Sequence, residues 1–152
     1  MKAVKISNAA WLPQIGEHIQ NFCNKINIDG IYAPNLFAFF SNAIQFGGNV
    51  SEFWVSFDED NKPWAFAHWT VSPPPHVATV YMGFLHSWSK DKKAARILLD
   101  EYLKFGKRSN AVFYLYSPIS KAHLRYLTSV LEKRGYTVKD TGVMNIISRK
   151  VL

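Results

Sequence analysis

The chain contains a single cysteine and no long apolar run. Because Cys23 has no second cysteine to pair with, an internal disulfide is excluded, and we expect a reducing, cytoplasmic setting. The roughly 18 consecutive apolar residues that a membrane-spanning helix requires are absent. The opening residues, Met1–Ile6, also lack the apolar core of a secretory signal. The sequence therefore predicts a soluble protein with no membrane segment.

Motifs of several enzyme classes are missing as well. The sequence has no Gly-x-Ser-x-Gly nucleophile turn, no Gly-x-x-x-x-Gly-Lys phosphate loop and no Gly-x-Gly-x-x-Gly dinucleotide fingerprint. Its histidines, cysteine and carboxylates do not have the spacing of a zinc site, so no metal is expected. These absences argue against a hydrolase of the Gly-x-Ser-x-Gly kind, a nucleotide-triphosphate-binding loop and a dinucleotide-dependent enzyme.

The composition is that of one folded domain with an uneven charge. Apolar residues make up 48% of the chain and aromatic residues 15%, which is enough to bury a sizeable core over residues 1–152. Residues 1–89 carry four Lys or Arg against six Asp or Glu, a balance of −2. Residues 90–152 carry fourteen against five, a balance of +9, and the halves sum to +7. Such a field attracts anions, which leaves nucleic acid, a phosphorylated cofactor and an acidic protein partner all open.

Hydrophobic periodicity predicts an α/β (α+β) domain in the order (β)-α-α-β-β-β-α-β-α-β-β. Three consecutive strands followed by alternating helices and strands imply a mixed, mostly antiparallel central sheet flanked by helices. The predicted elements are a strand over Lys2–Ile6, helices over Ala9–Ile26 and from Pro34 to Gly47, strands over Phe53–Phe57, Trp64–Val71 and Val77–Leu85, a helix over Ala94–Phe105, a strand over Ala111–Tyr116, a helix over Lys121–Arg134, and strands over Tyr136–Lys139 and Val143–Arg149.

The loop between the predicted strand over Val77–Leu85 and the predicted helix over Ala94–Phe105 carries many positive charges. Lys90, Lys92, Lys93 and Arg96 surround the predicted helix start. Cations at a helix N-terminus are unfavourable by about 0.3–1 kcal/mol each, and a bound anion would reverse that penalty. The unpaired amides of a helix start also suit a phosphate group. A solvated basic turn is the alternative.

The same loop resembles the cofactor signature of the GNAT N-acetyltransferase superfamily, Gln/Arg-x-x-Gly-x-Gly/Ala followed by a helix with a Leu-Leu pair. Aligning that pair with Leu98-Leu99 places Lys90 at the Gln/Arg position and Ala95 at the Gly/Ala position, while Lys93 replaces the first glycine. The resemblance implies that the chain binds acetyl-coenzyme A (acetyl-CoA). The residues that it implies for cofactor binding are Phe84, Leu85 and His86 along the pantetheine arm, Lys90, Lys92, Lys93, Ala94, Ala95 and Arg96 around the pyrophosphate, and Ser120 at the start of the last helix.

A second segment, Ser120–Leu127, resembles the late helix of the same family, which begins Asn-x-x-Ala and ends at a Gly-aromatic pair, here Gly135-Tyr136. Its string His123–Leu127 is also similar to small phage-encoded GNAT-like proteins. In the family a tyrosine on this helix protonates the departing coenzyme A thiolate. The resemblance therefore implies that Tyr126 is the general acid, although the family's position four residues before the glycine is Leu131 in this chain.

A catalytic base is harder to find. Acyl transfer needs a neutral amine, so a carboxylate, a histidine or an ordered water usually accepts its proton. Many family members carry a glutamate on the strand before the cofactor loop, whereas residues 77–89 contain no Asp or Glu and the matching positions are Thr79 and Tyr81. The expected base is therefore water, or His86 acting as a weak base. Glu52 and His68 are the other candidates. All three side chains also fit purely structural roles.

Two main functions remain open from the sequence. The first is an acetyl-CoA-dependent N-acyltransferase that acts on a primary amine lying against the early helices and the hairpin. The alternative is a catalytically inactive GNAT-fold module whose basic segment, residues 90–152, contacts nucleic acid or an acidic protein; the missing base and Lys93 favour it. A third hypothesis, an RNA-modifying acetyltransferase, combines the two.

Overall fold

The computed structural model describes residues 1–27, 31–72, 79–108, 112–115 and 121–135. The described elements are β1 (Lys2–Lys5), the 3₁₀ helix η1 (Ala9–Ile15), α1 (Gly16–Ile26), α2 (Ala33–Phe46), β2 (Ser51–Phe57), β3 (Pro63–Ser72), β4 (Thr79–Ser87), α3 (Lys93–Arg108), β5 (Val112–Leu115) and α4 (Lys121–Lys133). Their order matches the order predicted from the sequence. The two closing strands, predicted over 136–139 and 143–149, lie outside the described residues.

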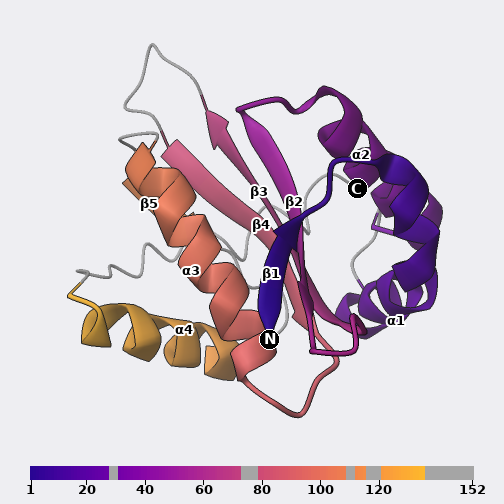
Figure 1. Cartoon of the computed structure of the whole chain (residues 1–152). Helices are drawn as coiled ribbons and strands as arrows, with labels where there is room; N and C mark the ends of the chain where they lie inside the picture. The colour runs from indigo at the N-terminus through magenta and orange to yellow at the C-terminus, as the bar shows by residue number, and fades with distance from the viewer. Residues whose placement is uncertain (28–30, 73–78, 109–111, 116–120, 136–152) are drawn as a thin grey trace.

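One sheet forms the centre of the molecule (Figure 1), with strand order β1-β2-β3-β4-β5. The first four strands pair antiparallel, and β5 pairs parallel to β4. The predicted mixed, mostly antiparallel sheet is therefore confirmed.

The helices cover the two faces of this sheet separately, α1 and α2 on one side and α3 and α4 on the other (Figure 1). Because successive side chains of a strand point to opposite faces of the sheet, each strand contributes residues to both sheet–helix interfaces. On β2, Phe53 and Val55 pack against η1, α1 and α2. On β3, the small side chains of Ala65 and Ala67 face α3, beside Trp69. Of the strand aromatics, Phe53, Phe57, Phe66 and Trp69 are buried, whereas Trp54 and Trp64 are partly buried.

The predicted first helix, Ala9–Ile26, is divided in two. Pro13 lies inside it, and a proline removes a backbone donor and clashes with the preceding turn. The chain accordingly forms η1 through Ile15, and α1 begins only at Gly16. α1 ends at Asn27, whose φ of 45° places it in the left-handed region. Cys23 is a buried free cysteine on this helix.

Two further turns follow their sequence signals. Asp58 Oδ1 accepts hydrogen bonds from the backbone N–H groups of Asp60 (3.0 Å) and Lys62 (2.9 Å), which closes the predicted β2–β3 turn. α4 is followed by Gly135, whose φ of 83° suits glycine. None of the described helices has both the length and the apolar character to cross a membrane.

Candidate functional site

β4 extends beyond the described part of β5. Their parallel pairing is described as far as Met82, which lies opposite Leu115, the last described residue of β5. β4 continues to Ser87, and among the described residues 84–87 pair with β3 alone.

A β-bulge falls at the same place. His68 of β3 pairs with Phe84, and the next residue, Trp69, pairs with Met82, which leaves Gly83 as an extra residue of β4. An extra residue bends a strand and changes the direction of the side chains that follow it. An isolated glycine inside a strand pattern is a sequence signal for such a bulge, and it could have located this one.

Between β4 and α3, side-chain oxygens accept hydrogen bonds from every second backbone N–H group, those of Ser89, Asp91 and Lys93. Ser87 Oγ accepts from the Ser89 N–H at 3.3 Å, and Ser89 Oγ accepts from the Asp91 N–H at 3.0 Å. Asp91 Oδ1 accepts from the Lys93 N–H at 2.9 Å. The Asp91 carboxylate thus lies at the start of α3, where the helix dipole favours negative charge. A phosphate group that bound these amides would compete with this carboxylate.

The predicted cationic side chains surround this turn and reach solvent. Ala94 is buried against the sheet, and Ala95 is half-buried. With Asp91, the four cations give the turn a local charge of +3, four minus one. The exposed side chains are those of Lys90, Asp91, Lys92, Lys93 and Arg96.

Tyr126 of α4 lies against this helix start. Its hydroxyl oxygen accepts a hydrogen bond from Arg96 Nη2 at 3.3 Å, and Lys92 Nζ lies 5.4 Å from the centre of its ring. Because the bond from Arg96 uses a lone pair of the hydroxyl oxygen, the Tyr126 proton can be donated elsewhere. The structure therefore brings Lys92, Arg96 and Tyr126 together at the start of α3.

His86 lies on the opposite face of the sheet from Tyr126. Its ring packs 5.1 Å from Phe22 of α1 and 5.9 Å from Trp88, measured between ring centres. Burial lowers the pKa of His86 to about 4, and the nearby charges of Lys25 and His18 act in the same direction. The imidazole is therefore neutral at pH 7 and a weak proton acceptor.

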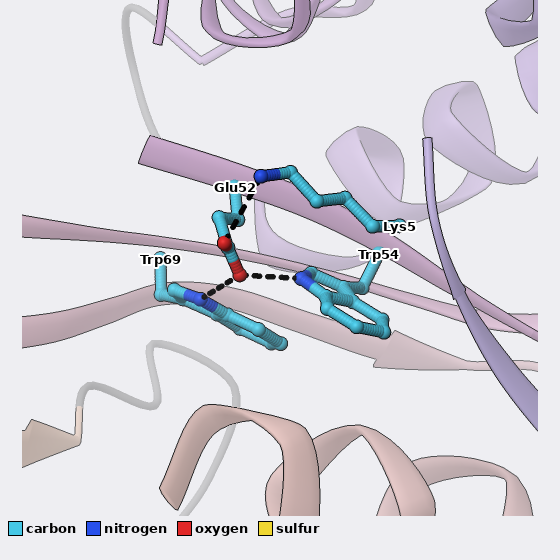
Figure 2. Close-up of polar contacts among 4 residues, drawn as sticks. All are labelled: Lys5, Glu52, Trp54 and Trp69. Atoms are coloured by element: carbon cyan, nitrogen blue, oxygen red, sulfur yellow. Dashed lines mark hydrogen bonds and ion pairs between the residues drawn. The ribbon is translucent and has the colours of Figure 1, made fainter. Parts of the chain in front are cut away.

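The other two candidate bases are held by neighbouring groups. His68 is 3% exposed, its Nε2 lies 2.7 Å from Ser51 Oγ, and burial lowers its pKa to about 4. Glu52 is 6% exposed and lies on the α3 side of the sheet. Its Oε1 accepts from Lys5 Nζ at 3.0 Å, and its Oε2 accepts from the indole N–H groups of Trp54 at 2.8 Å and Trp69 at 3.3 Å (Figure 2). Both arrangements fit structural roles.

The placement of the remaining predicted residues follows strand alternation. Phe84 is half-buried on the α1 and α2 side, whereas Leu85 is buried on the α3 side. Ser120 lies outside the described residues. In the described part of the chain, no three His, Cys, Asp or Glu side chains gather in a way that could hold a metal ion.

Comparison with known proteins gives the class of this fold. No protein-family model matches the chain, and no curated protein sequence does. Solved structures match it along nearly its whole length, and they are acetyltransferases of the GNAT fold. The chain therefore has the GNAT acetyltransferase fold.

Three of the similar structures illustrate the match. A predicted acetyltransferase from Clostridium acetobutylicum, solved with acetyl-CoA, is 17% identical with a TM-score of 0.65, and the match covers 92% of each chain. The aminoglycoside 6'-N-acetyltransferase of Acinetobacter haemolyticus is 9% identical with a TM-score of 0.66, covering 93% of this chain and 94% of its own. A second such enzyme, from Acinetobacter baumannii, is 7% identical with a TM-score of 0.65, covering 91% and 92%.

Proposed function

We propose that this protein is an acetyl-CoA-dependent N-acetyltransferase that acts on a primary amine. The observation that carries the proposal is the junction of β4 and α3. There the bulged strand runs directly into a turn ringed by four exposed cations. The GNAT fold of the chain and the acetyl-CoA in a structural neighbour support the same function.

The residues of the junction fit the donor substrate in shape and charge. The backbone of Phe84–His86, without a β5 partner among the described residues, would pair with the amide groups of the pantetheine arm. The turn from Lys90 to Arg96 would hold the pyrophosphate through its cations, and through the Lys93 N–H if the phosphate displaced the Asp91 carboxylate from it. Ser120 remains a predicted contact. Acetyl-CoA would supply an activated acetyl thioester beside the bulged part of β4.

The chemistry asked of the protein is limited to placing an amine and moving one proton. The neutral amine nitrogen attacks the thioester carbonyl carbon, a C–N bond forms, and the C–S bond breaks. The proton that the nitrogen loses is passed to water or weakly to His86. Tyr126 is the proposed acid for the departing thiolate, a role that requires it to leave its contacts with Lys92 and Arg96 when acetyl-CoA binds. The products are an amide and free coenzyme A.

The donor site is tested by reversing one charge at the start of α3. We expect saturating acetyl-CoA to stabilise the protein by about 3 kcal/mol at 100 times its Kd, a rise in Tm of about 5–10 °C. Lys93→Glu should abolish this rise, because it places a negative charge at the helix start. Differential scanning fluorimetry gives the measurement. Lys104→Glu is the matched control, since Lys104 lies farther along α3 in an ion pair with Glu101.

The converse substitution sharpens the test. Asp91→Asn keeps an oxygen for the Lys93 N–H but removes the charge that would repel a phosphate. It should therefore increase the acetyl-CoA shift while Lys93→Glu removes it. Equal shifts in all three proteins would exclude the turn as the donor site. A shift with duplex DNA and none with acetyl-CoA would instead favour a nucleic-acid-binding module.

The role of Tyr126 is tested by kinetics. Tyr126→Phe should lower kcat on the order of 100-fold, because the thiolate would leave without a positioned acid. The acetyl-CoA shift should stay within a degree or two of the unmodified protein, since the ring and its contact with Lys92 remain. Coenzyme A release, followed with a thiol reagent, measures kcat. A kcat equal to that of the unmodified protein would assign the acid to another group.

A further inference from the structure

An aromatic surface lies on the α1 and α2 side of β4, next to the junction. We call it the aromatic face, and it consists of His18, Phe39, Phe84, His86 and Trp88. Phe39 of α2 is 47% exposed, and its ring lies 6.0 Å from that of Phe84. The other members are half-buried. Phe84 is the first residue after the bulge, so this surface begins directly after Gly83.

The aromatic face is held in place by ring contacts. His18 stacks on Trp88 with ring centres 3.8 Å apart and planes 5° from parallel. Trp88 in turn donates its indole N–H to the Pro63 carbonyl at 3.0 Å, which ties it to the start of β3. Phe22 of α1 is buried and packs against both Phe84 and His86, with ring centres 6.0 Å and 5.1 Å apart. A planar ligand would therefore meet ordered rings on this surface.

The charges near this surface are weakly positive. α2 contains no charged residue from Ala33 to Phe46. The charged groups that act on His86 and His18 are Lys25, Lys62 and Glu17, which sum to +1. Glu52 lies on the far side of the sheet, Asp58 is hydrogen-bonded within its turn, and Asp91 caps α3. In the described part of the chain, no other carboxylate acts on these two histidines.

We propose that the acceptor is an arylamine, an amine attached directly to an aromatic ring and uncharged at neutral pH. This inference rests on the proposed function and gives its substrate class. A ring would stack on Phe39, Phe84 or Trp88. A protonated alkylamine would instead face Lys25 and Lys62, and the one carboxylate of the described residues whose charge acts on these histidines, Glu17, is exposed and outnumbered by the two lysines. The arylamine is uncharged and needs no proton removed before it attacks.

The transfer balances without a further reactant. The arylamine nitrogen uses its lone pair to bond to the acetyl carbonyl carbon as the C–S bond breaks. One of its two hydrogens leaves as a proton, and the thiolate gains a proton from Tyr126, which is then reprotonated. The products are an N-aryl acetamide and coenzyme A.

Two isomeric amines provide the test. 4-Methylaniline and benzylamine have the same formula, but only benzylamine is protonated at pH 7. With the full chain and acetyl-CoA, kcat/KM for 4-methylaniline should exceed that for benzylamine on the order of 100-fold at pH 7, because alkylamines are almost fully protonated there. Between pH 7 and pH 8.5 the benzylamine rate should rise about tenfold per unit, and the 4-methylaniline rate should stay flat.

A pair of variants on α2 tests the aromatic face. Phe39→Ala should raise KM for 4-methylaniline about fivefold with kcat nearly unchanged, because one stacking surface is lost. Phe46→Ala is the matched control: Phe46 is 80% exposed at the end of the same helix, and its removal should leave KM unaltered. Equal KM values for all three proteins would overturn the assignment of this surface.

The outcomes also separate this inference from the proposed function. Preferred acetylation of benzylamine or of an aminoglycoside at pH 7 would overturn the arylamine assignment and leave the acetyltransferase standing. An acetyl-CoA thermal shift without acetylation of 4-methylaniline would overturn the arylamine assignment too. Absence of both the thermal shift and any acetylation would overturn the proposed function itself.

Discussion

Glu52→Ala is expected to lower the free energy of unfolding by about 3 kcal/mol and the Tm by about 6–12 °C. Glu52 is nearly inaccessible to solvent, and its carboxylate accepts from one ammonium and two indole N–H groups. Alanine would leave the donors of Trp54 and Trp69 without this acceptor in the sheet, and a buried unpaired donor costs about 1–3 kcal/mol. Urea denaturation monitored by tryptophan fluorescence measures the change.

Lys5→Ala is the control for this first prediction. The Lys5 side chain is 41% exposed, so its ion pair is screened by water and should contribute no more than about 1 kcal/mol. A loss for Glu52→Ala no larger than the loss for Lys5→Ala would mean that the carboxylate is not needed for folding. If such a stable variant had also lost acetyl transfer, Glu52 would become the leading candidate for the base.

Acidification should destabilise the protein through His68. Its pKa is about 4 when folded, against about 6.5 for an unperturbed histidine. As the pH falls from 6.5 to 4, the unfolded chain gains a proton at this position that the folded chain does not. The free energy of unfolding should therefore fall by about 1.4 kcal/mol per pH unit, about 3 kcal/mol in all. Above pH 6.5 and below pH 4 this group should have no further effect.

The comparison with His68→Gln isolates this contribution. Glutamine keeps a polar partner for Ser51 Oγ but does not titrate in this range. Stability curves from urea denaturation at pH 7.5, 6.5, 5.5 and 4.5 should therefore fall less steeply for the variant. His86 should add a smaller slope of the same sign in both proteins, because its ring is partly open to solvent. Parallel curves would show that His68 takes up its proton as readily in the folded state as in the unfolded state.

Much of the fold could be predicted because local signals agree with the final packing. The β2–β3 hairpin follows from two apolar strands around Asp58–Pro63, and α3 follows from the helical spacing that ends near Gly106. The positive turn before α3 is likewise a local feature. What could not be predicted depends on residues far apart in the chain. Glu52 is held by Trp69, seventeen positions away.

The two proposed catalytic residues illustrate the same limit. Sequence motifs place His86 and Tyr126 near the loop and the last helix, but they do not say which face of the sheet each one occupies. Packing answers this, since His86 contacts Phe22 of α1 and Tyr126 contacts Arg96 of α3. The aromatic face was equally hidden, because Phe39 and Phe84 become neighbours only when α2 packs on β4.

Gly83 has a consequence that reaches beyond its own position. In an uninterrupted strand, residues two apart share a face, yet Met82 and Phe84 pair with adjacent β3 residues, Trp69 and His68, which lie on opposite faces. The extra residue therefore shifts the alternation between the two faces of the sheet by one position, so that β4 follows opposite alternation patterns before and after the bulge. Substitutions after Gly83 can therefore reshape the aromatic face while the strand pairing before it keeps its register.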